Sequence, residues 1–314
     1  MMSSNMNSTC ENTCLITNDV ETTSVYFNQL RPETAYKVWK EGMPILLDLY
    51  AKYNIKSTFF LCIDIVKLYP DVVKLVIPYG HEVASHGYSH EVNEAFDTMT
   101  YDRQLEHLVI SKNILEDISG QEVISFRAPA LRINRDTPVA LAEAGYKIDS
   151  SVPSQRFDFF LSFGSVNKFK WILAPRMPYR TNSDDLTKKG SGPIIEIPLS
   201  ATLLPFMGTS MRIMPGISKM QRFMLHQESR LTQKPLVFDI HPNEFIDEAS
   251  GQRTIARRSN NVITYFLADL IRSRLKVKNL GPKAVPLFNE MLDFYVRKQY
   301  CFNTIKDYAS GLNL

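Results

Sequence analysis

Residues 80–90 read Gly80-His81-Glu82-Val83-Ala84-Ser85-His86-Gly87-Tyr88-Ser89-His90, and they place a short strand directly before a pair of histidines. The strand is predicted over residues 82–85. His86 and His90 lie four positions apart, which is one helical turn, so both imidazoles can reach one ion. The alternative is that one histidine caps the loop and the other is solvated, because short motifs of this kind often occur without a ligand.

Segments rich in β-branched residues alternate with helical patterns on both sides of this stretch. Such alternation is typical of repeated βα units around a parallel sheet. The sequence therefore predicts an α/β fold, a (β/α) barrel that is distorted or incomplete. The predicted strands are residues 14–19, 57–62, 82–85, 122–126, 147–150, 194–198 and 236–241, and the predicted helices are residues 32–53, 101–116 and 136–144.

Length and composition indicate one globular unit. With 314 residues and 44% hydrophobic residues the chain can bury a sizeable core, and no linker divides it. We predict a flexible N-terminus over residues 1–12 and a single domain over residues 13–314. Residues 157–191, rich in Pro, Lys and Asn, are predicted to form a long loop over one end of the sheet.

The net charge and the absence of targeting patterns limit which partners and which cellular compartment the sequence predicts. The net charge of +3, from 36 basic and 33 acidic residues, is too small an excess to predict nucleic-acid binding. The N-terminus has no basic region followed by an apolar one, and no apolar run reaches the roughly 20 residues of a transmembrane helix. Four cysteines are too few for a disulfide framework, so we expect free thiols. These features predict a cytoplasmic protein; the sequence indicates no oligomeric state.

Two carboxylates stand at the end of the first predicted strand. Side chains alternate along a strand, so Asp19 and Glu21 point to the same face. Carboxylates placed there are costly unless they are paired or bind a metal, and barrel enzymes carry their chemistry at this end. The alternative is that Asp19 caps a turn and Glu21 is solvated.

Four later strands carry charged or titratable residues at their ends. Arg127 can clamp a carboxylate with a bidentate fork, although a surface salt bridge is the plainer interpretation. His241 ends an apolar strand, and Asp149 can fix the tautomer of a nearby histidine and raise its pKa. Glu196 either contacts substrate or pairs with a base such as Arg180.

The order and content of these five elements resemble the polysaccharide deacetylase family, also called the NodB homology or carbohydrate esterase family four fold. The resemblance runs from about Cys14 to the C-terminus. The family usually has Thr-Phe-Asp-Asp at the first element, where this chain has Thr17-Asn18-Asp19-Val20-Glu21. A branch with Asp-Val-Glu, associated with surface and exopolysaccharide biosynthesis, is more similar. Residues 80–90, 126–129 and 240–242 also resemble that branch.

The resemblance implies a mechanism and a site. Asp19 would be the general base, His241 the acid, and Glu21, His86 and His90 the ligands of a divalent ion, Zn²⁺ by preference. Whether Asp19 or Glu21 is the carboxylate ligand stays open. Arg127 would anchor Asp19, and Asp149 would tune His241.

The implied reaction is hydrolysis of an N-acetyl or N-formyl group from an amino sugar, with a carrier-linked intermediate of surface polysaccharide biosynthesis as substrate. Ala130 and Ser150 replace an aromatic residue and a tryptophan of many relatives, so the sugar-facing wall is expected to differ. Residues 253–278 carry seven basic residues against one acidic; they either face carrier phosphates or a membrane surface, or form a solvated helix face.

Two other functions compete with this one. The first is a metal-independent hydrolase of cyclic amides or ureides, of the allantoinase type, on the same fold. The second is a carbohydrate-binding relative without catalysis. A metal content near zero in active protein would favour the first, whereas the joint presence of Asp19, His86, Arg127 and His241 argues against the second.

Overall fold

A curled, mostly parallel sheet forms the centre of the molecule in the computed structural model, which describes residues 12–156, 169–249 and 272–314. The parallel strands run in the order β11, β1, β4, β5, β6, β7 and β10. Their bounds are β1 (Thr13–Val20), β4 (Thr58–Leu61), β5 (Glu82–Ser85), β6 (Ser125–Phe126), β7 (Ile148–Asp149), β10 (Ile195–Glu196) and β11 (Leu236–Ile240).

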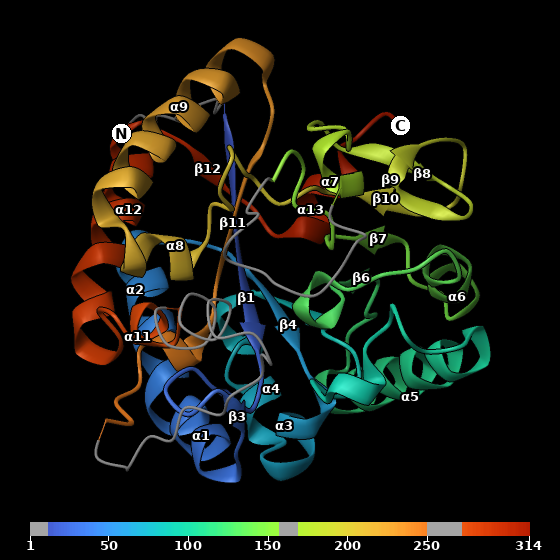
Figure 1. Ribbon diagram of the computed structural model, residues 1–314, viewed down its shortest axis with the longest axis horizontal. Coiled ribbons are helices and arrows are strands. Elements are labelled where there is room, and N and C mark those ends of the chain that lie inside the picture. Colours follow the sequence, from blue (N-terminus) through green and yellow to red (C-terminus); the bar gives the residue numbers. More distant parts are fainter. Residues whose placement is uncertain (1–11, 157–168, 250–271) are drawn as a thin grey trace, which may run out of the picture.

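Helices surround the sheet (Figure 1). They follow the strands along the chain as the βα alternation predicts. Their bounds are α1 (Pro32–Lys37), α2 (Met43–Tyr53), α3 (Ile63–Leu68), α4 (Asp71–Lys74), α5 (Tyr101–Ser119), α6 (Thr137–Glu143), α7 (Phe169–Ile172), α8 (Gly208–Ile213), α9 (Pro215–Thr232), α11 (Arg272–Lys276), α12 (Ala284–Arg297) and α13 (Ile305–Ser310).

The barrel is incomplete between β10 and β11. Instead of a strand ladder, the Ser200 amide donates a hydrogen bond to the Val237 carbonyl, at 3.1 Å, and Met207 forms an isolated parallel bridge with Asp239. The predicted distorted or incomplete (β/α) barrel is therefore confirmed. Since the parallel strands all point the same way, their carboxyl ends meet at one rim.

Local packing explains two departures from the predicted elements. The predicted helix over residues 32–53 contains a π-helical turn, Val38–Gly42, where a side chain on Gly42 would lie 2.4 Å from the Pro242 carbonyl oxygen. Glycine thus lets the helix touch the loop that follows His241. The predicted strand over residues 122–126 shrinks to β6, because the Val123 amide donates to Glu116 Oε1 and not to a neighbouring strand.

The segment predicted as a loop over residues 157–191 is partly ordered as a hairpin, which corrects that prediction. β8 (Tyr179–Asn182) and β9 (Asp185–Lys189) are antiparallel and extend the sheet beside β10. Asn182 Oδ1 accepts from the Asp184 amide, at 3.0 Å, and this polar turn separates the two strands. Residues 157–168 lie outside the described part of the chain.

Short accessory strands complete the fold. β12 (Cys301–Phe302) pairs with the start of β1, and β2 (Thr23–Ser24) pairs with β3 (Gln29–Leu30) beside the end of β1.

The structure tests the predictions about the cysteines and about membrane-spanning helices, but only for the described residues. Cys14 and Cys62 are free and buried, whereas Cys301 is disulfide-bonded, so the expectation of free thiols is wrong at that residue. No helix among the described residues is long and apolar enough to cross a membrane. Of the segment predicted over residues 1–12, residues 1–11 lie outside the described residues, as do residues 253–271 of the basic segment 253–278.

Candidate active site

The two histidines and Glu21 converge at the carboxyl rim of the sheet. His86 and His90 follow β5 in a loop and not in a helical turn, since Gly87 has φ +74° and bends the chain. Their Nε2 atoms nevertheless lie 3.3 Å apart, and Glu21 Oε2 lies 2.5 Å from His90 Nε2. The three side chains can place one ligand atom each within 4.8 Å of one another.

The surroundings of these three residues prepare them to bind a cation. His86 Nδ1 lies 2.9 Å from the Arg127 carbonyl oxygen. A carbonyl only accepts, so Nδ1 carries the proton and Nε2 keeps its lone pair. Burial lowers the pKa of His86 to about 4, which keeps the ring neutral as a ligand must be. Glu21 Oε2 is buried and otherwise without a hydrogen-bond partner among the described residues.

Glu21 is held as a carboxylate. Burial alone would raise its pKa, but the charge and hydrogen bond of His90, together with the charges of His241 and His86, outweigh burial and lower the pKa of Glu21 to about 2. Asn243 Nδ2 donates to the Thr23 carbonyl and lies 3.5 Å from Glu21 Oε1. Two imidazoles and a carboxylate match the donor set of a catalytic Zn²⁺ site. The residues present therefore fit a divalent ion.

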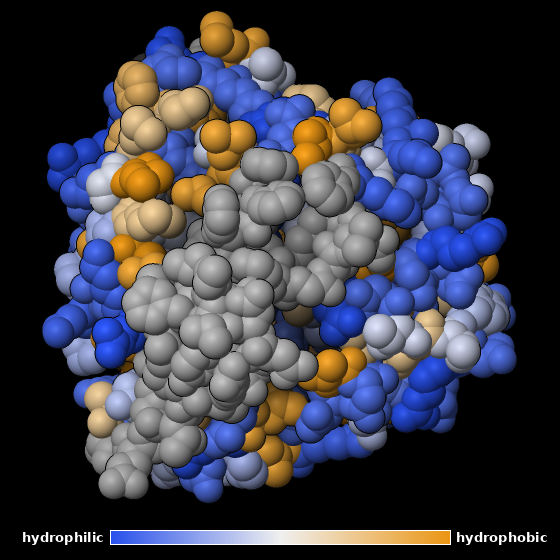
Figure 2. All heavy atoms as spheres, in the orientation of Figure 1, coloured by the Kyte–Doolittle hydropathy of each residue, from blue (hydrophilic) through white to orange (hydrophobic). Residues whose placement is uncertain are grey.

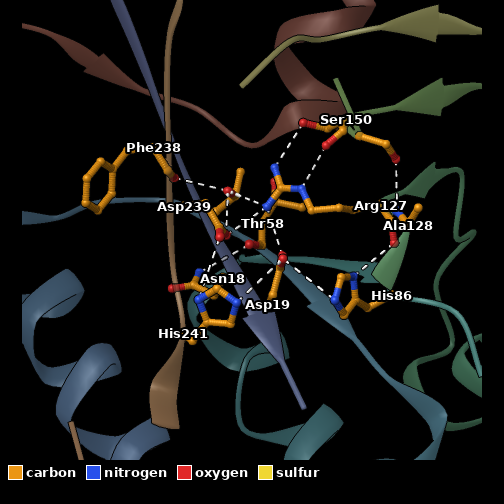
Figure 3. Close-up of polar contacts among 12 residues, drawn as sticks. Asn18, Asp19, Thr58, His86, Arg127, Ala128, Ser150, Phe238, Asp239 and His241 are labelled. Carbon is orange, nitrogen blue, oxygen red and sulfur yellow. Dashed lines mark hydrogen bonds and ion pairs between the residues drawn. The ribbon is translucent and has the colours of Figure 1, made fainter. Parts of the chain in front are cut away.

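Arg127 is the centre of a second cluster (Figure 3). Its side chain is fully buried, and its Nη1 lies 2.8 Å from Asp19 Oδ1 and 2.8 Å from Asp239 Oδ1. Nε donates to the Ser150 carbonyl and Nη2 to Ser150 Oγ, both at 2.9 Å. Ser150, which replaces the tryptophan of many relatives, thus fixes the guanidinium from the side of β7. The predicted anchoring of Asp19 by Arg127 is present in the geometry.

Asp19 and Asp239 differ in protonation although they share one arginine. Burial alone would raise the pKa of Asp19, but Arg127, His86 and His241 outweigh it and hold the pKa well below its usual value. Burial, and then the charge of Asp19, raises the pKa of Asp239 to about 7. Asp19 is therefore ionised at neutral pH, which is the state that a general base requires.

His241 faces Asp19 from the end of β11. Its Nε2 lies 3.9 Å from Asp19 Oδ2, and its Nδ1 lies 3.4 Å from Glu244 Oε1 and 3.7 Å from Asp239 Oδ2. Burial alone would lower the pKa of His241, but Asp239 and the hydrogen bond with Glu244 raise it well above its usual value. The ring is cationic at neutral pH and can donate a proton.

Asp19, Asp239 and His241 also bring three potential ligand atoms within 4.8 Å of one another. A second ion is not needed there, because the Arg127 guanidinium already contacts both carboxylates. The trio is better suited to moving protons.

Asp149 does not tune His241, which corrects the sequence-based prediction. Within the described chain, the carboxylates that lie within 4.0 Å of His241 are Asp19, Asp239 and Glu244, and Asp149 is not among them. Asp149 instead hydrogen-bonds with Glu196, its register partner on β10, and accepts from Ser151 Oγ at 2.7 Å. Glu196 pairs with Asp149 and the Val152 amide, and not with Arg180, which donates to the carbonyls of Leu314 and Gly192.

Sequence reasoning missed Asp239 and Glu244 as the partners of His241. The sequence could have indicated Asp239, because it lies two residues before His241 and residues two apart on a strand share a face. It was weaker for Glu244, whose place depends on the short 3₁₀ turn Pro242–Glu244 and on buried Arg212, which binds its carboxylate.

The buried pair Asp149 and Glu196 predicts a dependence of stability on pH. Burial raises both pKa values, and for Glu196 the neighbouring Asp149 raises it further. The folded state thus keeps a proton that the unfolded chain releases, so this stability is complete below about pH 4 and is lost as pH rises through the raised pKa. In wild type the free energy of unfolding should fall as pH rises. In Glu196→Gln we expect this slope to be smaller, by up to about 1.4 kcal/mol per pH unit.

Urea unfolding at several pH values measures this slope, with Glu122→Gln as the control, because Glu122 is an exposed partner of Lys147. Equal slopes for wild type and Glu196→Gln would contradict the shared proton.

Comparisons with known proteins relate part of the chain to one family. The polysaccharide deacetylase family model matches residues 27–148, a stretch that holds His86, His90 and Arg127 but neither Asp19 nor His241. This stretch, which is less than half of the chain, is therefore similar to polysaccharide deacetylases.

A peptidoglycan deacetylase of Helicobacter pylori is 31% identical to this chain over 116 residues, which are 37% of this chain and 39% of that protein. The similarity thus spans well under half of that relative.

Solved structures agree with the fold over nearly the whole chain. A Mycobacterium smegmatis structure assigned to the polysaccharide deacetylases has a TM-score of 0.60 at 16% identity and covers 96% of this chain and 90% of its own. An allantoinase has a TM-score of 0.61 at 15% identity, with 97% and 91% covered. The fold alone does not separate a deacetylase from a ureide hydrolase, so the site has to do so.

Proposed function

We propose that this protein is a metal-dependent hydrolase that removes an N-acyl group from an amino sugar of a surface polysaccharide or of its carrier-linked precursor. The observation that carries the proposal is the convergence of Glu21, His86 and His90 beside Asp19 and His241. The named activity of the Helicobacter pylori relative supports an N-acetylated amino sugar as substrate.

Glu21, His86 and His90 would hold the ion, and Zn²⁺ suits two imidazoles and one carboxylate. When bound, such an ion supplies a Lewis acid that polarises the acyl carbonyl and makes water more acidic. His86 Nε2 is 3.7 Å from Asp19 Oδ2, so the base lies directly beside the ligand cluster.

The protein's own residues account for the proton transfers. Asp19, kept ionised by Arg127, takes a proton from the attacking water. His241, kept cationic by Asp239 and Glu244, donates a proton to the amine as it leaves. The proposed acid and base lie 3.9 Å apart, and the base also lies beside His86 of the ligand cluster, so the proposed reaction would occur where these side chains meet.

A cleft lined by other residues than those of the site would offer room for sugar units. It encloses about 500 Å³ including open solvent and is lined by the loop Ala130–Arg135, by Trp171 and by the β8–β9 hairpin. Ala130 and Leu131 have φ of 53° and 56°, a strained conformation that side chains rarely adopt. Trp171 lines the cleft but is only 6% exposed, so the polar and charged residues Asp97, Arg132, Asn134 and Asp184 supply the groups that a saccharide would contact.

Acetate release tests the activity. Purified protein loaded with Zn²⁺ is incubated with N-acetylglucosamine oligomers, and both acetate and new primary amines are measured. We expect equal amounts of the two products, with loss of both after chelation. Turnover that persists in metal-free protein, on a cyclic amide, would instead support the allantoinase-type alternative.

Glu21→Gln should cost the protein its ion. An amide oxygen is a much weaker ligand than a carboxylate, so we expect elemental analysis to find about one equivalent of metal in wild type and a small fraction of it in the variant. Asp64→Asn is the control, because Asp64 is a neighbouring carboxylate that binds Thr22 Oγ1 and the Ile65 amide. Full metal content in Glu21→Gln would assign the carboxylate ligand to Asp19.

A further inference from the structure

Helix α9 turns its polar face inward. Gln221 Nε2 donates to the Leu204 carbonyl at 2.6 Å, Ser229 Oγ donates to the Lys234 carbonyl at 2.8 Å, and His226 Nδ1 lies 3.0 Å from the Tyr300 hydroxyl. These bonds fix the rotation of the helix about its axis. The buried residues of α9 are Ser218, Gln221, Leu225, His226 and Ser229.

The outward face of α9 is apolar, the reverse of an ordinary surface helix. Its members are large hydrophobic residues at helical spacing, and about half or more of most of these side chains is exposed. At 1.5 Å per residue the stripe is about 21 Å long. Figure 2 shows apolar atoms over this helix, at the upper left. They are Ile217 (45%), Met220 (60%), Phe223 (56%), Met224 (52%) and Leu231 (84%).

Neighbouring segments widen this stripe. Leu203, which is 70% exposed, precedes the Leu204 carbonyl that Gln221 holds. Met177, 44% exposed, follows Arg176, whose guanidinium binds Glu228 of α9. We call Leu203, Met177 and the exposed apolar residues of α9 the α9 patch. Apolar patches of this kind mark interaction surfaces.

The charges around the α9 patch are mainly basic. Among the described residues, helix α9 and the side chains close to it include six basic residues and two acidic ones. The basic residues are Arg176, Lys219, Arg222, Arg230, Lys234 and Lys298. Both acids are already paired, Glu228 with Arg176 and Lys234, and Glu290 with Lys219 and Arg222. Arg230 and Lys298 remain, both close enough to lower the pKa of His226 by their charge. The rim therefore favours an anionic surface.

We propose that the α9 patch is a docking surface for an anionic lipid membrane, an inference that goes beyond the proposed activity and does not depend on it. Large apolar side chains enter the interface while lysine and arginine contact the lipid phosphates. A second copy of the chain would bring an identical basic rim, so like charges would meet.

The position of α9 connects docking to the site. The helix begins directly after α8, whose Arg212 binds Glu244, the partner of His241. Its first turns therefore lie next to the carboxyl rim of the sheet. A membrane on the α9 patch would bring this rim close to lipid-linked material.

Vesicle co-sedimentation of the full chain tests this docking. The probes are vesicles of phosphatidylglycerol and phosphatidylcholine in equal parts, and vesicles of phosphatidylcholine alone, at about 0.1 M and about 0.5 M salt. We expect binding to the anionic vesicles, a loss of at least about tenfold at high salt or without phosphatidylglycerol, and a loss of about tenfold in Met220→Gln/Phe223→Gln. Arg230→Gln should weaken binding severalfold.

Val139→Gln is the control, because Val139 is also an exposed hydrophobic residue (45%) but lies on α6. It should bind like wild type, and all variants should keep their melting temperature and their turnover of soluble substrate. Absence of binding to anionic vesicles, or wild-type binding by Met220→Gln/Phe223→Gln, would overturn the proposal. A concentration-dependent dimer that this double variant abolishes, without vesicle binding, would replace the membrane by a second copy.

Discussion

Replacing Asp19 by asparagine is expected to lower deacetylase turnover by about a thousandfold while the protein keeps its metal. Asparagine preserves the shape and can still accept a hydrogen bond from Arg127, whose Nη1 lies 2.8 Å from Asp19 Oδ1. It cannot take a proton from water. Since Glu21, His86 and His90 form the ligand cluster without Asp19, the ion should remain.

Turnover and metal content have to be measured on the same preparation. Asp64→Asn serves again as the control, and it should retain turnover within a few-fold of wild type. Joint loss of metal and activity in Asp19→Asn would show that Asp19 is a ligand. Retained activity would remove the general-base role altogether.

The sequence predicted those parts of the fold that follow from local pattern. The strand of residues 82–85 agrees with β5 at both ends, because apolar alternation and the flanking glycine and histidine mark it clearly. Strands β6, β7 and β10 are shorter than predicted. Side chains of neighbouring elements satisfy the backbone there, as Glu116 does for Val123, and pattern alone does not reveal such partners.

The sequence predicted the site residues that stand at the ends of strands and whose role does not depend on which other acid lies beside them. Asp19, Arg127 and His241 each end a strand, and a parallel sheet brings strand ends together. The role of Asp149 failed because its nearest carboxyl group, Glu196, comes from a strand 47 residues later in register with it. Which of several acids pairs with His241 is a question of sheet order, and the sequence does not contain that order explicitly.

In helix α9 the sequence pattern is clear but points to the wrong face as the buried one. A sequence pattern reports where apolar residues lie around a helix, and the usual assumption is that they face the core. Here the polar side is buried, because Gln221, His226 and Ser229 find hydrogen-bond partners inside. An inverted helix can be recognised only when the structure shows which face is covered.

Arg127→Met is expected to lower the free energy of unfolding by about 3–5 kcal/mol, a large part of the total stability of a typical domain. The change takes away the guanidinium that contacts the buried carboxyl groups of Asp19 and Asp239, and it removes the donors to Ser150. Without Arg127 the folded pKa of Asp239, already above its unfolded value, rises further, and the pKa of Asp19 loses the first of the charges that lower it. The folded variant then loses stability as pH rises, so the loss relative to wild type should be larger at pH 8 than at about pH 5.

Urea unfolding of metal-free protein at the two pH values measures this loss. Arg127→Lys keeps the charge but loses the fork, so an intermediate loss is expected, and this variant keeps the prediction testable if Arg127→Met does not fold. Arg103→Met is the control: Arg103 is half exposed, pairs with Glu94 and Glu106, and should cost less than about 1 kcal/mol. A loss in Arg127→Met no larger than in Arg103→Met would mean that Asp19 and Asp239 do not depend on this cation. The low pKa of Asp19, and with it the general base, would then need another source.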